Sequence, residues 1–187
     1  NAKELSYLID SLLEVANPES VQGDIFALIS PHAGLSFSGS TAAFGYKLIQ
    51  GKSYKTVIVI GLSHNYGFKG VSIYPQGAFR SPLGDLVIDS EFTKKLLNKD
   101  NEIFFEPDAF EKEHSVEVQL PFLQKVLSGF KIVPIVMGNS SFSTCQKLAN
   151  LIKEAIGERK DVLVVASTDM YHGYDYQEAD IIDNLTL

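Results

Sequence analysis

The hydrophobic positions of this chain alternate between helical spacing and short β-branched runs. A first helix is predicted by five apolar residues at helical spacing, which are Leu5, Leu8, Ile9, Leu12 and Leu13. Core strands are predicted at residues 24–30, 56–61, 131–137 and 161–166. Helices are predicted between them at residues 42–49, 90–98, 116–127 and 141–156. This alternation favours an α/β fold with a largely parallel or mixed central sheet flanked by helices on both faces.

Shorter apolar pieces interrupt this alternation between residues 70 and 88. Runs at residues 71–74 and 86–88 flank a turn sequence at 81–85, which predicts an antiparallel extension. Ser90 is expected to cap the helix that follows, and Pro121 either kinks its helix or lies in the first turn. Without an internal repeat or linker, residues 1–187 are interpreted as a single domain. The chain starts without Met and stops in a helix-like segment, so we expect residues to be missing at both ends.

Composition narrows the classes of function. With 187 residues, 45% of them hydrophobic and 21% charged, the chain can bury a substantial core. A net charge of -7 without any run of Lys and Arg argues against nucleic acid or an anionic membrane as partner, and leaves a small molecule or a peptide. No apolar run approaches the ~18 residues that span a bilayer, and the first residues lack signal-peptide character. We therefore expect a cytoplasmic location.

All four histidines fall where a predicted strand ends or a helix begins. His32, His64 and His172 each follow a predicted core strand, and His114 precedes a helix. Open α/β sheets bind ligands beyond the carboxyl ends of their strands, and histidine is the commonest metal ligand. The four side chains are therefore predicted to share one metal or acid/base site, although each alone also fits a turn or capping role.

Two acidic residues accompany these histidines. Asp169 and His172 are three residues apart and share a face if the segment is helical. Asp169 then either binds a metal together with two histidines or fixes the tautomer of one histidine, and the alternative is a helix cap beside an exposed His172. Glu113 and His114 form either an acid/base pair or a charged helix start.

The other candidates are weaker. The segment 38–41 (Ser-Gly-Ser-Thr) is expected just before a helix, where its N–H groups can bind an anion. Tyr46, Tyr171 and Tyr174 line a pocket or belong to the core. Cys145, the single cysteine, is interpreted as a packing residue because no histidine lies near it in sequence. The glycine-rich phosphate-binding fingerprints are absent, which disfavours nucleotide binding.

A series of motifs occurs in order between about residues 24 and 174. The motifs are Pro31-His32-Ala33-Gly34, Phe37-Ser38-Gly39, Ala42-Ala43, Gly61-Leu62-Ser63-His64, Ser81-Pro82-Leu83-Gly84, Glu113-His114-Ser115-Val116-Glu117-Val118-Gln119-Leu120-Pro121-Phe122 and Ser167-Thr168-Asp169-Met170-Tyr171-His172. In these motifs the chain resembles the Memo family, which includes the proteins named AmmeMemoRadiSam system protein B. The family's fold is similar to that of the class III extradiol dioxygenases of the LigB type.

The resemblance implies a metal-binding crevice in which His32 and His64 bind the metal. It implies that His172 and Asp169 lie beside them in an acid/base or supporting position, with His114 in the same pocket. The third ligand is a cysteine in the family and a glutamate in the dioxygenases, and it is expected beyond residue 187. Cys145 lies upstream of that position and is not assigned. A functional link to a radical SAM protein and an AMMECR-type domain is also implied.

Two hypotheses follow. In the first, the protein is a metal-dependent oxidoreductase of the extradiol-dioxygenase type that uses Fe(II) or Cu, with Zn as a further option, while His172 or His114 moves the proton. In the second, a vestigial dioxygenase site binds a peptide, a phosphopeptide or a small ligand without catalysis. Metal-assisted hydrolysis is a weaker third option, because two-metal sites usually need more carboxylates.

Overall fold

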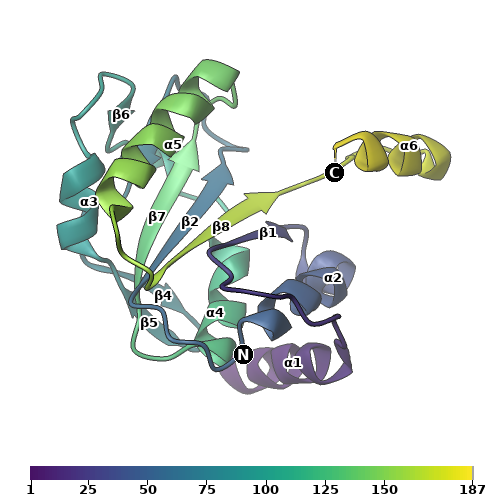
Figure 1. Ribbon diagram of the computed structural model, residues 1–187. Helices are drawn as coiled ribbons and strands as arrows, with labels where there is room; N and C mark the ends of the chain where they lie inside the picture. Colours follow the sequence, from purple (N-terminus) through teal and green to yellow (C-terminus); the bar gives the residue numbers. More distant parts are fainter. Residues whose placement is uncertain (187) are drawn as a thin grey trace.

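The computed structural model describes residues 1–186, which form a six-stranded sheet and a separate hairpin (Figure 1). The strands are β1 (Ala27–Pro31), β2 (Thr56–Leu62), β3 (Val71–Ile73), β4 (Ala78–Ser81), β5 (Gly84–Val87), β6 (Ile103–Phe104), β7 (Lys131–Met137) and β8 (Val162–Thr168). The sheet order is β1-β8-β2-β7-β3-β6, and its first four strands are parallel. β3 runs antiparallel to β7, and β4 pairs with β5 as the hairpin. This confirms the mixed, mostly parallel sheet. The antiparallel part differs from the prediction, because the strand that pairs across the turn with β5 is β4, whereas the predicted run at residues 71–74 forms β3 and pairs with β7.

Helices cover both faces of the sheet. The α-helices are α1 (Ala2–Val15), α2 (Leu35–Leu48), α3 (Ser90–Leu96), α4 (Leu120–Val126), α5 (Phe142–Ile156) and α6 (Tyr176–Thr186), of which all but α6 cover the sheet. α1, α2 and α4 pack together on one face, and α3 and α5 on the other (Figure 1). Side chains of β2 alternate between these layers, since Val57 and Val59 join the core beside α1 and α2 while Ile58 joins the core beside α3 and α5. Burial on both faces explains the continuous β-branched run of this strand.

The structure corrects several predicted boundaries. β1 starts at Ala27 rather than residue 24, and the side chain of Asp89, not Ser90, caps α3 by accepting a hydrogen bond from the Phe92 N–H. Pro121 lies in the first turn of α4, where its missing N–H costs no helical hydrogen bond. The short 3₁₀ helix η2 (Glu117–Gln119) precedes α4, so the predicted helix from residue 116 is split into two pieces.

The largest correction concerns α2, which begins at Leu35 rather than after Ser40. The segment 38–41 therefore lies within the helix and not before it, so the prediction of an anion site at a helix start there is wrong. A Cβ at Gly39 would lie 2.9 Å from the Leu12 side chain, so glycine permits α1 to pack closely against α2. Gly39 therefore reflects helix packing rather than a helix start.

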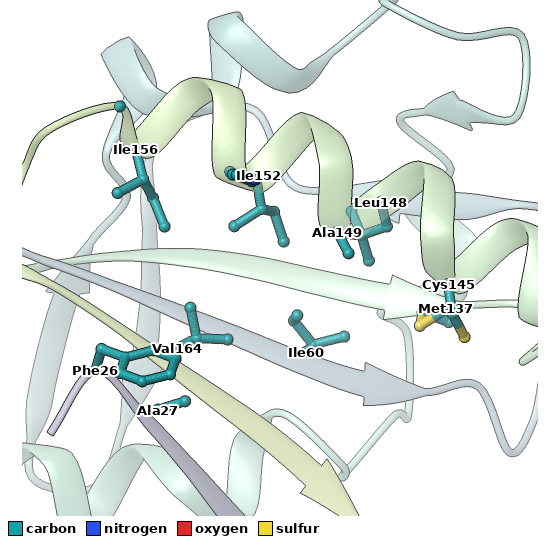
Figure 2. A pocket seen from close by; sticks show the side chains of 12 residues that line it. Phe26, Ala27, Ile60, Met137, Cys145, Leu148, Ala149, Ile152, Ile156 and Val164 are labelled. Atoms are coloured by element: carbon teal, nitrogen blue, oxygen red, sulfur yellow. The ribbon is translucent and has the colours of Figure 1, made fainter.

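An apolar hollow lies between α5 and the edge of the sheet near β1 and β8 (Figure 2). Its volume is about 480 Å³, and its lining includes Phe26, Ile60, Cys145, Leu148, Ile152 and Val164. Cys145 is an exposed free thiol on the wall of this hollow. Lys153 is the one ionisable lining residue besides that thiol, so the lining offers little acid/base or metal-binding chemistry.

The last helix, α6, extends away from the sheet and its covering helices (Figure 1). None of its side chains in the described residues is buried, and Ile181 and Leu185 are exposed. The Asp183 carboxylate accepts a hydrogen bond of 2.7 Å from the Tyr171 N–H, which connects α6 to the segment after β8. Within residues 1–186 we find no helix both long and apolar enough to cross a membrane.

Candidate metal centre

Three predicted site residues follow the carboxyl ends of neighbouring parallel strands. His32 comes directly after β1, Asp169 directly after β8, and His64 two residues after β2. β8 lies between β1 and β2, with Pro31 opposite Thr168 in the register. The strand ends therefore bring these side chains to one edge of the sheet, as the sequence predicts.

His114 reaches the same place from a loop that precedes η2. The adjacent Ser115 hydroxyl donates a hydrogen bond of 2.9 Å to the Leu62 carbonyl, which fastens this loop to the end of β2. A Cβ at Gly61 would lie 2.2 Å from the Ser115 hydroxyl oxygen, so a side chain there would displace the loop. Glycine at position 61 thus allows His114 to approach His64.

The imidazoles of His32, His64 and His114 form a compact cluster. One potential ligand atom from each ring lies within 4.8 Å of the others. The His32 ring centroid is 5.0 Å from that of His64 and 5.6 Å from that of His114, and the His64 and His114 centroids are 4.7 Å apart. His32 is buried, whereas the other two side chains are partly exposed. The cluster is thus open on one side, as a site for an ion and an exchangeable ligand requires.

Glu113 holds His64 in place. One carboxylate oxygen accepts a hydrogen bond of 2.6 Å from the His64 backbone N–H, and the other contacts His64 Nδ1 at 2.9 Å and the Ser115 N–H at 2.8 Å. Burial opposes the charged form of Glu113, but these hydrogen bonds prevail and hold the pKa of its carboxyl at about 2. Because an ionised carboxylate only accepts, His64 Nδ1 carries a proton and its Nε2 is free for a metal.

His32 presents a buried nitrogen without a hydrogen-bond partner. Its Nδ1 contacts the Ser167 hydroxyl at 3.1 Å, but its Nε2 finds no hydrogen-bond partner among residues 1–186. Burial lowers the pKa of His32, which favours the neutral imidazole. Asp169 Oδ1 faces Nε2 at 3.4 Å. If Nε2 carries a lone pair, two acceptors face each other, and a cation between or beside them would relieve this repulsion. The donor set therefore fits a metal ion.

His172 stands apart from the three clustered imidazoles. Its ring is 84% exposed, and its Nδ1 lies 3.2 Å from Asp169 Oδ2. Asp169 thus contacts buried His32 through one oxygen and exposed His172 through the other. Three of the four histidines therefore share one cluster, as predicted. The fourth, His172, lies outside the cluster and contacts it only through the Asp169 carboxylate.

Two buried residues that the sequence pattern does not single out, Ser167 and Gln119, support the cluster. Gln119 contacts both Ser167 and the hydroxyl of Tyr46. Tyr46 itself is a core residue stacked on Phe122, whereas Tyr174 is fully exposed. A buried glutamine amid apolar residues of a helix start is the signal that could have found this support, because such an amide needs polar partners.

Comparisons with known proteins identify relatives of this chain. A family model described as Memo-like protein matches residues 1–186. The chain belongs to the Memo family. Among its relatives are a MEMO1 family protein of Caldivirga maquilingensis, 38% identical over 151 residues, and one of Thermotoga neapolitana, 40% identical over 152 residues. A protein memo-1 homolog of Caenorhabditis elegans is 31% identical over 175 residues.

The matched regions cover most of this Memo chain but only part of each relative. They include 79% of the chain in the two prokaryotic comparisons and 92% in the nematode one. They span 53%, 54% and 49% of the respective relatives, so the chain covers about half the length of these proteins. The histidine cluster lies within the shared family region.

Proposed function

We propose that this Memo chain forms a metal centre in which His32 and His64, the two expected ligands, bind Fe(II) or Cu together with His114. His114 thereby changes from the expected proton-moving residue to a ligand, and the remaining positions are left open to a small molecule or to the ligand expected beyond residue 187. Imidazole nitrogen suits iron, copper and zinc, and three neutral histidines are a common donor set. When bound, the metal would supply electron transfer or Lewis-acid activation to O2 or a phenol-like substrate.

The observation that carries this proposal is the buried, unpartnered His32 Nε2. It lies beside two further imidazoles and opposite a carboxylate oxygen. A buried polar nitrogen without a partner costs free energy of about 1–3 kcal/mol, and a metal–ligand bond would remove that cost. A structural role for His32 alone would instead leave both ring nitrogens hydrogen bonded.

Asp169 and His172 give the site a route for protons. The Asp169 carboxylate contacts His32 on the inner side and the exposed His172 on the outer side. A proton released by a bound substrate can pass to Asp169 and from there to the His172 ring, which exchanges with solvent. Asp169 and His172 are therefore the acid/base pair in this proposal, and Asp169 can also add an oxygen ligand.

Metal analysis of the full-length protein tests the proposal. We expect close to one iron or copper ion per chain, with loss of that ion in His32→Ala and in His64→Ala. His172→Ala is the matched control, because it removes an exposed imidazole outside the cluster and should retain the metal. A wild-type protein without a bound transition metal would overturn the proposal.

Oxygen uptake after anaerobic loading with Fe(II) then tests redox activity. Uptake that depends on His64 would support an oxidoreductase. Tight binding of a phosphotyrosine peptide that is unaffected by chelators would instead favour the non-catalytic binding alternative.

A further inference from the structure

A buried chain of hydrogen bonds stands behind His32, on the side away from the open face of the cluster. It runs from His32 through Ser167 and Gln119 to the hydroxyl of Tyr46. All four side chains are buried. The proton route through Asp169 makes no use of Ser167 or Gln119, so their polar groups need another explanation.

The orientation of the Gln119 amide follows from its partners. Gln119 Nε2 lies 3.0 Å from the Pro31 carbonyl, which can only accept, so the nitrogen and not the oxygen must face it. The Tyr46 hydroxyl donates to Gln119 Oε1 at 2.7 Å. Burial raises the pKa of Tyr46, so the phenol keeps its proton and remains a donor. The second hydrogen of Gln119 Nε2 is then donated to Ser167 Oγ, 2.8 Å away.

The direction of the Ser167 hydroxyl follows in turn. Its single hydrogen is donated to the Ser115 carbonyl, which cannot donate in return. With that hydrogen committed, Ser167 Oγ can only accept from His32 Nδ1, which lies 3.1 Å away. His32 Nδ1 therefore carries the proton, and His32 Nε2 carries a lone pair toward the cluster.

We propose that Ser167 and Gln119 are positioning residues that hold His32 in the tautomer whose Nε2 is free to bind a metal ion. The metal part of this inference rests on the proposed function, while the tautomer part concerns the metal-free protein. Partners on the far nitrogen of a metal-binding histidine fix its tautomer and ring orientation. The Glu113 carboxylate fixes the tautomer of His64. The tautomer of His32 is fixed by the uncharged chain Ser167–Gln119–Tyr46, which we call the neutral relay.

Nuclear magnetic resonance of the full-length, metal-free protein with ¹⁵N-labelled histidine tests the tautomer directly at about pH 8, where an ordinary histidine is neutral. Long-range proton–nitrogen correlations distinguish a protonated Nδ1 from a protonated Nε2, and the His32 signals are those that vanish in His32→Asn. We expect a protonated Nδ1 in the wild-type protein. A protonated Nε2 would overturn the proposal without any variant having to fold.

Ser167→Ala tests the positioning role. We expect the variant to populate the other tautomer and its affinity for Zn²⁺, used as a redox-inert probe, to fall roughly 10- to 100-fold. Gln119→Leu should shift both readouts in the same direction by less, since the Ser115 carbonyl still takes the Ser167 hydrogen. An unchanged tautomer in Ser167→Ala would contradict the proposal.

Ser72→Ala is the matched control. Ser72 is likewise buried in a strand, its hydroxyl donates to the Glu106 carbonyl, and its strand β3 is separated from β2 by β7 in the sheet. It should leave tautomer and affinity unchanged even if it costs similar stability. Wild-type protein with a protonated His32 Nδ1 that binds no Zn²⁺, iron or copper would overturn the proposed metal centre. The same result would still support the proposal that Ser167 and Gln119 set the His32 tautomer.

Discussion

His32 and His64 present the same ring nitrogen to one cluster but are held by opposite kinds of chemistry. His64 is partly exposed and is hydrogen bonded to the ionised carboxylate of Glu113. His32 is buried and is hydrogen bonded to the neutral hydroxyl of Ser167. A carboxylate makes its histidine a stronger electron donor, whereas the Ser167 hydroxyl adds no charge to the interior. Both supports are buried, so the Glu113 charge depends on the hydrogen bonds that it accepts from His64 and Ser115, and the support of His32 needs no such compensation.

Lowering the pH should weaken the Glu113 support of His64 before it affects the Ser167 support of His32. The folded-state pKa of Glu113, about 2, lies below the ordinary value of 4.5, so the folded state binds fewer protons in this window. Glu113 then contributes about 3 kcal/mol of stability, which is fully present above pH 4.5 and is lost as the pH falls toward 2. Denaturant unfolding of metal-free protein from about pH 7 to 3 measures the part of this loss that falls above pH 3, about 2 kcal/mol. In a variant at Glu113, the free energy of unfolding should no longer fall in this way with pH. If its pH dependence equals that of the wild-type protein, Glu113 is not the group responsible.

Glu113→Gln should weaken both stability and metal binding. An amide places an NH2 group where one carboxylate oxygen accepts, so at least one of the His64 and Ser115 N–H groups loses its partner. We expect a loss of about 2 kcal/mol in the free energy of unfolding, because an unsatisfied buried donor carries a cost of this size. Zn²⁺ affinity should fall roughly tenfold or more, measured by titration calorimetry.

The control for that variant is Glu117→Gln. Glu117 lies on the same segment but is exposed. Its substitution should change the free energy of unfolding by less than about 0.5 kcal/mol, which is typical of surface positions. Equal losses for the two variants would show that the carboxylate of Glu113 has no special part in holding His64.

His172→Ala should give the smallest effect in this series. Its ring is 84% exposed and contacts the cluster only through Asp169. We expect stability and metal content to stay at the wild-type level, while any proton-dependent turnover falls and its pH profile changes. Loss of metal in this variant would place His172 among the ligands and remove the distinction between inner and outer histidines.

The sequence predicted the elements whose burial leaves a clear pattern. β7 was placed correctly because a parallel strand buried on both faces is a continuous apolar run. The start of α2 was missed because Gly34 caps it without a side-chain hydrogen bond and Gly39 is selected by its contact with Leu12. Such tertiary contacts override local patterns.

The same limit applies to the candidate site. His32, His64 and Asp169 lie together because each follows a strand end, and His114 joins them as predicted, whereas His172 lies outside the cluster. The close approach of His114 depends on the Ser115–Leu62 hydrogen bond and on the missing side chain of Gly61, which no spacing rule contains. The support of His64 by Glu113 likewise requires a loop conformation between residues 49 positions apart.

X-ray absorption at the metal edge tests the central claim most directly, because it counts the imidazoles bound to one ion. For full-length protein loaded with a single Zn²⁺, we expect nitrogen scatterers at ~2.0–2.1 Å with the multiple-scattering signature of three histidines. That number should fall to two in His114→Ala. A wild-type spectrum with fewer than three imidazoles, unchanged in His114→Ala, would contradict the account.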